Sequence, residues 1–450
     1  MYSRDLGWLR LAILLPVLSL VLLSQCYWFV HAWRLARKIG RPLPRLLLRG
    51  ACLSAFVLID LVLALNVGFG PSQIVWRNST VTSLSGLWLS SALLAYLAVQ
   101  FVTAVAWMLR AVRRIVALIW RSASPAAKAE AEPAAQREPA AENDPAHPPV
   151  DLARRRFVQT ATALAGAIPF AGAAYGFAFE RLNYQVRRVD LPVSGLPPAL
   201  RGLRIAQLSD IHIGSYMSAA DVRRAVGMAN DLGADLAVVT GDFLTGVHDP
   251  LEACIAELSR LRAPLGVWGC NGNHEVYAGV EALAATLFER YGMRLLRQQN
   301  AELLWRGQAF NLIGVDYQRE RRRRPMLAAI APMVRRDVPN ILLSHNPNSF
   351  PRAAELGIEA MLAGHTHGGQ VKFEILDHRF SPARFLTPYV AGMYQRPLGA
   401  AAALTDDELR AGAPATQSAV VYVNRGLGTI GAPVRLGVPP EITLHTLCPA

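Results

Sequence analysis

The sequence predicts two parts: a region of transmembrane helices, followed from about residue 184 by an α/β domain of layered sheets flanked by helices. Three apolar stretches in the first 110 residues are each long enough to cross a bilayer. After residue 184, short β-rich apolar runs alternate with segments of helical period. A chain of 450 residues with 52% hydrophobic content is also too long and too apolar for one soluble domain of ordinary size.

Residues 1–121 form the predicted membrane region. Its three transmembrane helices are expected at residues 11–30, 51–70 and 87–109. Basic residues cluster after the first helix and after the third, whereas the loop after the second helix holds only Arg77. Because Lys and Arg are retained on the cytoplasmic side, this alternation predicts that the N-terminus lies outside and that the third helix ends inside.

A linker and a fourth apolar stretch follow this region. Residues 122–153 are rich in Ala, Pro and Glu and are predicted to be a flexible linker. Residues 154–180 begin with Arg154-Arg155-Arg156-Phe157 and continue as an apolar run rich in Ala and Gly. We interpret this segment as either a twin-arginine export signal or a fourth transmembrane helix, and either would carry the rest of the chain to the outer side.

The charge distribution argues against nucleic-acid binding, and the cysteine spacing argues against a structural zinc site or a disulfide scaffold. The net charge of +13 comes from basic residues spread over short loops, with no zinc-finger, RNA-binding or helix-turn-helix pattern, so nucleic acid is not an expected partner. The five cysteines include no Cys-x-x-Cys pair and predict neither a structural zinc site nor a disulfide scaffold. A single disulfide bridge among Cys254, Cys270 and Cys448 remains an alternative.

The domain at residues 184–450 is expected to contain strands with helices between them. The strands are predicted at residues 203–208, 236–240, 266–269, 310–315, 341–344 and 360–363. Ser218 followed by Asp221 predicts a capped helix that starts near Ala219. Residues 280–291 carry apolar residues at helical spacing and predict another helix.

Five polar patches follow these strands. They are Asp210-Ile211-His212, Gly241-Asp242, Gly272-Asn273-His274-Glu275, Ser344-His345 and Gly364-His365-Thr366-His367. Imidazole, carboxylate and amide oxygen are ligands of divalent first-row metals that leave positions open for water. Because loops at the carboxyl ends of such strands converge on one edge, we expect the patches to meet in one pocket. The pattern predicts a metal site that supports hydrolysis.

The order of these patches resembles that of the calcineurin-like metallophosphoesterases. Further motifs resemble the membrane-associated bacterial phosphodiesterase branch of that superfamily: Gly314-Val315-Asp316, Gly364 to Gln370, Pro388-Tyr389 to Tyr394, and Arg425-Gly426-Leu427-Gly428. The resemblance covers about residues 186–448. It implies a layered β-sandwich core flanked by helices, and a metal-dependent phosphoesterase that most often cleaves phosphodiesters.

The resemblance also implies two divalent metal ions, which would be Mn, Fe or Zn. Carried over residue by residue, it places Asp210, His212 and His367 on the first ion, Asn273, His345 and His365 on the second, and Asp242 between the two. A hydroxide shared by the ions would attack phosphorus in line with the leaving oxygen.

The expected catalytic residues are Asp242 and His274. His274, together with Asn273, would contact the substrate phosphate, and it would stabilise the transition state or protonate the leaving group. Glu275 would orient neighbouring groups without binding a metal.

Together these features predict a multi-pass protein of the inner (plasma) membrane whose catalytic domain lies on the extracytoplasmic side. The expected partners are the lipid bilayer and a phosphate ester linked to a lipid or to the cell envelope. Two alternatives stay open. One is a lipid pyrophosphatase resembling UDP-diacylglucosamine hydrolases, whose nucleotide-linked substrate is available mainly in the cytoplasm. The other is a non-catalytic membrane scaffold with a structural metal site.

Two further segments have two interpretations each. The basic run at residues 319–324 would either guide an anionic substrate or headgroup, or form a solvated loop. The aromatic and apolar segment from Phe380 to Tyr394 would either touch a lipid chain or form a rim packed on the core.

Overall fold

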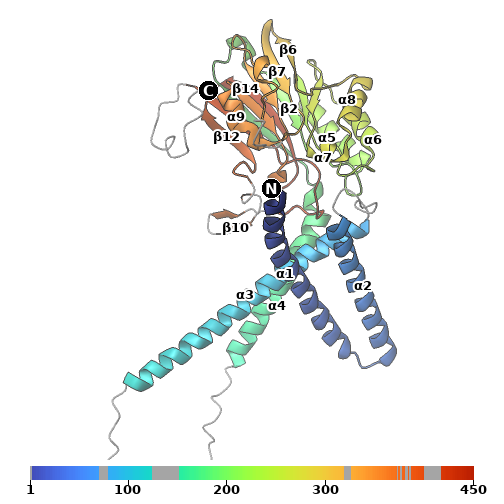
Figure 1. The fold of residues 1–450 in the computed structure, drawn as a ribbon, viewed down its shortest axis with the longest axis vertical. Helices are drawn as coiled ribbons and strands as arrows, with labels where there is room; N and C mark the ends of the chain where they lie inside the picture. Colours follow the sequence, from blue (N-terminus) through green and yellow to red (C-terminus); the bar gives the residue numbers. More distant parts are fainter. Residues whose placement is uncertain are drawn as a thin grey trace, which may run out of the picture. The chain divides into compact units, whose positions relative to one another are not determined.

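The computed structural model describes residues 3–69, 80–123, 152–318, 326–371, 373–375, 378–380, 384, 387–399 and 417–450 (Figure 1). It divides into two compact units, one of Met1–Val57 with Trp88–Gly172, the other of Leu58–Leu87 with Ala173–Ala450. Most of the predicted linker, and the basic run at 319–324, lie outside the described residues.

Four long helices precede the sheets. They are α1 (Ser3–Arg37), α2 (Pro42–Phe69), α3 (Thr80–Ala123) and α4 (Leu152–Ala178). Within the described residues, two helical segments, Leu84–Val116 and Leu152–Leu182, are long and apolar enough to cross a membrane. Their mean hydropathies are 2.0 and 1.4. Large apolar side chains stay exposed on them, such as Phe101 at 70% and Phe157 at 73%, as expected of a surface that faces lipid.

One aromatic residue from each helix contributes to a cluster within the first unit. The ring of Trp28 on α1 lies 5.5 Å from that of Phe170 on α4, and Phe56 on α2 lies 5.7 Å from Trp88 on α3. Trp88 and Phe170 are 5.4 Å apart. The indole nitrogen of Trp28 also donates to the carbonyl of Ala92 at 2.8 Å. Two of these three contacts are edge to face, and aromatic contacts of this kind favour one packing of the helices.

Two mixed six-stranded sheets form the second unit. The first sheet has the order β1 (Gln185–Val193), β14 (Glu441–Pro449), β2 (Arg204–Leu208), β3 (Leu236–Thr240), β4 (Val267–Cys270) and β5 (Arg294–Leu295). The second has the order β12 (Gly392–Pro397), β13 (Ser418–Val423), β9 (Ala360–Ala363), β8 (Asn340–Leu343), β7 (Gln308–Gly314) and β6 (Gln299–Trp305). Strands β2 to β5 are mutually parallel, as are β7, β8, β9 and β13. A separate antiparallel pair joins β10 (Phe373–Ile375) to β11 (His378–Phe380).

The sheets pack face to face and helices cover both outer faces. Buried side chains such as Val238 of the first sheet and Leu343 of the second share the core between the sheets. The outer face of the first sheet packs on α5 (Ala219–Asn230), α6 (Leu251–Leu258) and α8 (Glu281–Arg290), which Figure 1 shows together on one side. The outer face of the second packs on α9 (Phe350–Glu355). The layered β-sandwich flanked by helices is therefore confirmed.

The element predictions agree closely with the structure. Strands β3 and β9 have the predicted bounds, and the other four predicted strands differ by one or two residues. Ser218 accepts from the Asp221 N–H at 3.2 Å and the Asp221 carboxylate accepts from the Ser218 N–H at 3.0 Å, which confirms the capped start of α5. The structure does not contain the disulfide bridge that was left open among Cys254, Cys270 and Cys448, because all five cysteines are free.

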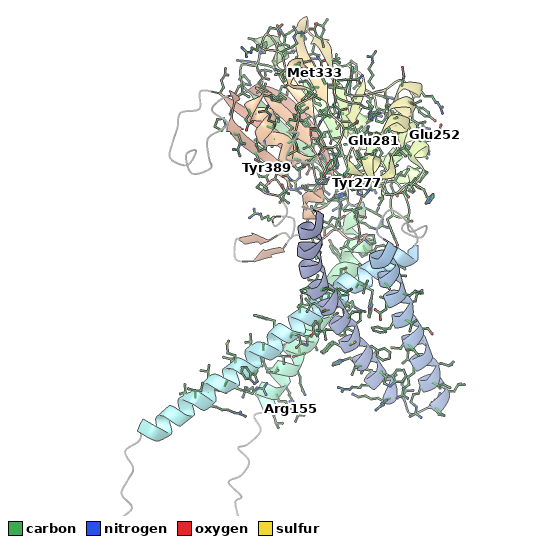
Figure 2. The ribbon with its side chains drawn as sticks, viewed as in Figure 1. Arg155, Glu252, Tyr277, Glu281, Met333 and Tyr389 are labelled. Atoms are coloured by element: carbon green, nitrogen blue, oxygen red, sulfur yellow. The ribbon has the colours of Figure 1, made fainter. Side chains whose placement is uncertain are left out.

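The segment ending at Tyr394 behaves as a packed rim in its described part. Tyr389, labelled in Figure 2, is 8% exposed and its ring lies 5.7 Å from that of Phe350 on α9. The ring of Tyr394 packs against Tyr389 at 5.2 Å. These contacts favour the packed interpretation over lipid contact for these tyrosines.

Candidate metal centre

The polar patches lie directly after strands of both sheets. Asp210 and His212 follow β2, and Asp242 follows β3. A short helix, α7 (Asn273–Ala278), begins three residues after β4 and carries the Asn-His-Glu patch in its first turn. His345 follows β8 and the last two histidines follow β9. The carboxyl ends of the parallel strands in both sheets thus supply one set of loops.

These loops bring the donors into two overlapping groups. In one group the ligand atoms of Asp210, His212, Asp242 and His367 all lie within 4.8 Å of one another. In the other the same holds for Asp242, His345 and His365. Asp242 belongs to both groups, with its Oδ2 3.0 Å from Nε2 of His345 and 3.5 Å from Nε2 of His212.

Several buried oxygen and nitrogen atoms in this cluster are suited to bind a metal cation. Asn273 Oδ1 is buried and accepts no hydrogen bond in the described part of the chain. His345 Nε2 is close to Asp242 but is too poorly aligned to form a hydrogen bond with it. Nε2 of His212 and Nε2 of His367 face each other at 3.1 Å. Buried polar atoms normally have partners, so atoms in this arrangement fit divalent metal ions.

Hydrogen bonds on the far side of the rings fix the histidine tautomers. His345 Nδ1 lies 2.6 Å from the carbonyl of Thr240, and His367 Nδ1 lies 3.3 Å from the carbonyl of Gly428. A carbonyl can only accept, so in these bonds Nδ1 carries a proton, and Nε2 is the nitrogen that faces the cluster. His212 Nδ1 contacts the Thr245 hydroxyl at 3.1 Å. Such partners orient metal-binding imidazoles.

The backbone at the cluster is strained. Asp210, His212, Asp242, His365 and His367 have φ values of 50°, 49°, 55°, 75° and 52°, in the left-handed region that non-glycine residues avoid. They are five of the nine described non-glycine residues with positive φ. Each costs about 1–3 kcal/mol, and such strain concentrates at functional sites.

Two glycines allow the loops to approach each other. A Cβ on Gly272 would lie 2.1 Å from Oδ1 of Asp242. A Cβ on Gly364 would lie 2.0 Å from Oγ of Ser209 and 2.3 Å from Oδ2 of Asp210. Only glycine fits at these two positions without displacing a carboxylate of the cluster.

Glu275 supports the cluster through main-chain amides. Its buried carboxylate accepts from the N–H groups of Gly272 at 2.7 Å, Asp242 at 2.9 Å and Phe243 at 2.7 Å. Burial and the nearby Asp242 raise the pKa of Glu275 to about 7, although the amide donors oppose this shift. The orienting role expected of Glu275 corresponds to these contacts.

His274 borders the cluster without joining either donor group. Its ring meets that of His212 edge to face at 4.8 Å, and its main-chain N–H donates to Oδ1 of Asp242 at 2.9 Å. Nδ1 lies 2.7 Å from the carbonyl of Thr245, so this nitrogen carries the proton. Nε2 is then the ring atom available to a substrate.

Charges inside the cluster are strongly coupled. Burial raises the pKa of Asp210 to about 6. Burial also opposes ionisation of Asp242, but the surrounding histidines outweigh it and hold the pKa of Asp242 well below its usual range. Burial lowers the pKa of His212 to about 3 and that of His367 well below its usual value, so both rings are neutral, the form that binds metal. For His345 the two carboxylates outweigh burial and raise the pKa to about 10. The carboxylates thus attract positive charge to the cluster.

Two tyrosines that the sequence analysis did not single out line one edge of the centre. Tyr277, labelled in Figure 2, is 44% exposed and its ring lies 5.7 Å from His274. Tyr317 lies 5.3 Å from His365, and the two tyrosine rings are 6.4 Å apart. They form an aromatic edge beside the histidines.

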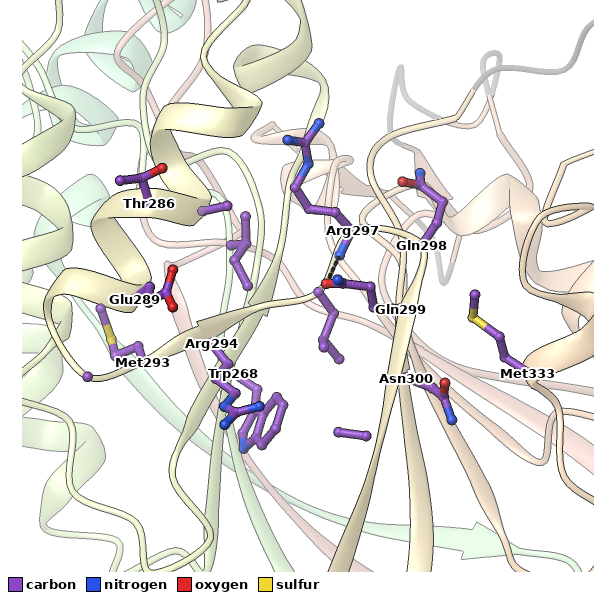
Figure 3. Close-up of a pocket in the computed structure, with 15 residues that line it drawn as sticks. Trp268, Thr286, Glu289, Met293, Arg294, Arg297, Gln298, Gln299, Asn300 and Met333 are labelled. Carbon is purple, nitrogen blue, oxygen red and sulfur yellow. Dashed lines mark hydrogen bonds between the residues drawn. The ribbon is translucent and has the colours of Figure 1, made fainter.

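A separate groove lies where edge strands β5 and β6 end the two sheets (Figure 3). It has a volume of about 1110 Å³, and its lining includes Trp268 and Arg297 but no residue of the metal cluster.

Nε of Arg297 contacts Oδ2 of Asp316 at 3.0 Å, and Asp316 Oδ1 accepts from Asn271 Nδ2 at 2.7 Å. Asp316 of the Gly-Val-Asp motif therefore braces the residue before Gly272.

Comparison with known proteins agrees with this architecture. Residues 203–369 match the family described as calcineurin-like phosphoesterase, and residues 9–181 match the family described as probable calcineurin-like phosphoesterase, transmembrane domain. The "Transmembrane protein with metallophosphoesterase domain" of Bos taurus is 30% identical over 57% of this chain and 56% of its own length. The protein of the same name from Danio rerio is 28% identical over 63% and 61%.

A bacterial relative is similar over nearly its whole length. The "Uncharacterized metallophosphoesterase YkuE" of Bacillus subtilis (strain 168) is 27% identical over 66% of this chain and 98% of its own length. The match to the two vertebrate relatives spans little more than half of their length. The chain therefore carries a domain of the calcineurin-like metallophosphoesterase family, the layered α/β domain with the candidate metal centre, and this domain follows a region that matches the transmembrane domain of such proteins.

Proposed function

We propose that the protein is a membrane-anchored phosphodiesterase that uses two divalent metal ions. Family membership supports a metal-dependent phosphoester hydrolase in general. The observation that carries the two-metal part of the proposal is the sharing of Asp242 by two groups of ligand atoms, which is the arrangement that two neighbouring ions require.

The proposed ligands follow the two groups. The first ion would be held by Asp210, His212 and His367, the second by Asn273, His345 and His365, and both by Asp242. Asn273 joins the second set because its unpartnered oxygen fits a metal. Mn, Fe and Zn all accept such ligands, and a bound pair of these ions supplies an activated water and positive charge near neutral pH.

The residues around the donors would bind and orient the phosphate. His274 holds its proton on Nδ1 against the Thr245 carbonyl, so Nε2 would face the substrate and, when protonated, donate to the leaving oxygen. Asn273 would bind the phosphate beside it. The exposed ring of Tyr277 would contact the group esterified to that phosphate.

Charge distribution supports an extracytoplasmic catalytic domain in the plasma membrane. The last turn of α1 carries Arg34 and Arg37, the connection to α2 carries Lys38 and Arg41, and α4 has an arginine triplet in its first turn, so both ends would face the cytoplasm. Helix α4 would then end outside, next to the catalytic domain's first strand. A lipid or an envelope polymer with a phosphodiester bond is the substrate class that such an anchor would bring to the centre.

The test uses the full chain in detergent with Mn²⁺ and a chromogenic phosphodiester beside the matching monoester. We expect metal-dependent turnover of the diester that collapses in His274→Ala but persists in His248→Ala, a substitution of an exposed histidine in a nearby loop. Greater turnover of the monoester would contradict the diester preference. No turnover of either ester by metal-loaded protein would contradict the phosphodiesterase and favour the lipid pyrophosphatase or the scaffold.

Topology has its own test, with alkaline phosphatase fused after residue 450 in a bacterial host. An active fusion is expected, because this reporter matures only outside the cytoplasm. An inactive fusion of normal abundance would place the domain in the cytoplasm and would favour the lipid pyrophosphatase.

A further inference from the structure

Arg435 is a fully buried arginine whose partners are main-chain carbonyls. Its exposed fraction is 0%. Within the described part of the chain, its guanidinium donates to the carbonyls of Arg425, Gly426, Gly428 and Val438 at 2.5–3.3 Å. Burial lowers the pKa of Arg435 to about 10, so the side chain keeps its charge near neutral pH. Arginine is seldom fully buried, and this one fixes a turn instead of pairing with a carboxylate.

The turn that it fixes lies against the metal cluster. The Gly428 N–H donates to the carbonyl of Asp210 at 2.7 Å, and the Leu427 N–H donates to that of Ser209 at 3.0 Å. A Cβ on Gly428 would lie 2.3 Å from the carbonyl oxygen of Ile211 and 2.9 Å from Cβ of His212. The turn is thus packed onto the loop that carries two of the proposed ligands.

One carbonyl connects the arginine to a ligand. The oxygen of Gly428 accepts from Nδ1 of His367 at 3.3 Å and from Arg435 at 3.2 Å through Nε and 2.5 Å through Nη2. The direction of this carbonyl decides which way the imidazole of His367 turns its Nε2. Several carbonyl oxygens that converge on one point repel one another, and the planar guanidinium with its five donors holds them together.

We propose that Arg435 is a positioning residue that sets the orientation of His367 through Gly428 and so tunes the affinity of the first metal ion. The inference rests on the proposed function, because it presumes that His367 binds a metal. Arg435 itself touches neither the substrate nor a metal in this account.

The end of helix α4 gives independent access to the main chain that carries Arg435. A Cβ on Gly176 would lie 2.4 Å from the carbonyl oxygen of Arg435 and 2.7 Å from Cγ1 of Val434. The ring of Phe177 packs on Tyr216 at 5.8 Å, and Arg181 Nη1 donates to the Tyr216 carbonyl at 2.9 Å, which holds this end of the helix in place. An added methyl at residue 176 must therefore displace the backbone of Arg435, and the guanidinium with it.

The test is titration of the full chain in detergent with Mn²⁺ by calorimetry, with no substrate present. The variants are Arg435→Met, Arg435→Lys and Gly176→Ala. The matched controls are Arg201→Met, an exposed arginine, and Gly227→Ala, a helical glycine with open space around it. We expect Arg435→Met to lower the affinity for one of the two ions by about 10- to 100-fold and to leave the affinity for the other unchanged. Loss of the hydrogen bond that orients a metal ligand has an effect of this size in other proteins.

The other variants separate geometry from charge. Arg435→Lys keeps the charge without the planar fork, so it should stay impaired, and full recovery by lysine would overturn positioning by the fork. Gly176→Ala should weaken the same ion even if Arg435→Met fails to fold. Unchanged affinity for both ions in a folded Arg435→Met, or in Gly176→Ala, would overturn the inference while the proposed function stood. Wild-type protein that binds no Mn²⁺ would overturn the proposed function and this inference with it.

Discussion

Glu275 offers the sharpest test of how the metal loops are held, because its contacts can be counted. Oε2 accepts from the N–H groups of Gly272 and Asp242, whereas Oε1 accepts from that of Phe243 and, at a longer 3.4 Å, from that of Leu244. In Glu275→Ala these four buried donors lose their acceptor. At about 1–3 kcal/mol for each of the three short bonds, the free energy of unfolding should fall by about 3–9 kcal/mol. That is a large part of the stability of a typical domain.

Glu275→Gln should cost less for a geometric reason. The amide can turn so that its nitrogen takes the place of Oε1, which leaves the Phe243 N–H as the main unpaired donor and keeps both bonds of Oε2. The expected loss is then about 1–3 kcal/mol. Glu289→Gln, at an exposed position of α8, is the matched control and should change stability by less than about 0.5 kcal/mol.

The assay is urea unfolding of the full chain in detergent, followed by near-UV circular dichroism with a chelator present so that metal binding does not contribute. The expected order of stability is wild type and Glu289→Gln, then Glu275→Gln, then Glu275→Ala. If both Glu275 variants unfolded with the control, the carboxylate would not hold these loops and the reasoning would fail.

Three further predictions follow from single contacts. Gly364→Ala places a methyl 2.3 Å from Oδ2 of Asp210, so the purified protein should lose bound metal by elemental analysis; full metal content would contradict the packing. Asp316→Asn removes the charge that faces Arg297 at 3.0 Å and should lower the free energy of unfolding by about 1 kcal/mol; no loss relative to exposed Asp190→Asn would show that this ion pair contributes nothing. Burial lowers the pKa of His445 to about 3, so the unfolded chain takes up a proton below about pH 6.5 that the native chain refuses. The contribution of His445 to stability should therefore be full above that pH and fall by about 1.4 kcal/mol per pH unit on acidification, in addition to the contributions of His212 and His367. The loss of stability between pH 7 and pH 5 should be smaller in His445→Gln than in the wild type by that amount.

Six strands could be predicted from the sequence, but the edge strands were missed, and so were two largely buried central strands, β13 and β14. Strands β3 and β9 are buried at every residue and appear as continuous apolar runs, so their bounds were predicted correctly. The edge strand β1 was missed because it mixes Arg, Asp and Pro192 with apolar residues and is largely half-exposed. Strand β6, at the edge of the other sheet, alternates exposed and half-buried residues and gave equally little signal.

The apolar stretches predicted to cross the membrane fall on helices that are longer than the stretches themselves. Helix α3 runs for 44 residues, whereas the apolar stretch that predicted it covers residues 87–109. Several arginines lie beyond that stretch, yet the chain stays helical through them because arginine is a good helix former.

The proposed ligands could be found from the sequence because side-chain chemistry identifies them and strand ends bring them together. Their supports could not. The carbonyls of Thr245 and Gly428 orient His274 and His367, but a main-chain acceptor carries no side-chain signal. Arg435 reads as a surface residue, since burial of an arginine depends on a tertiary environment that composition does not describe.

The central claim is that Asp242 lies between two metal ions. The most direct measurement is anomalous diffraction from crystals grown with Mn²⁺. The account predicts two anomalous peaks that flank the Asp242 carboxylate, one beside His212 and His367 and the other beside Asn273 and His345. One peak, or peaks away from Asp242, from protein that binds Mn²⁺ in solution would contradict it.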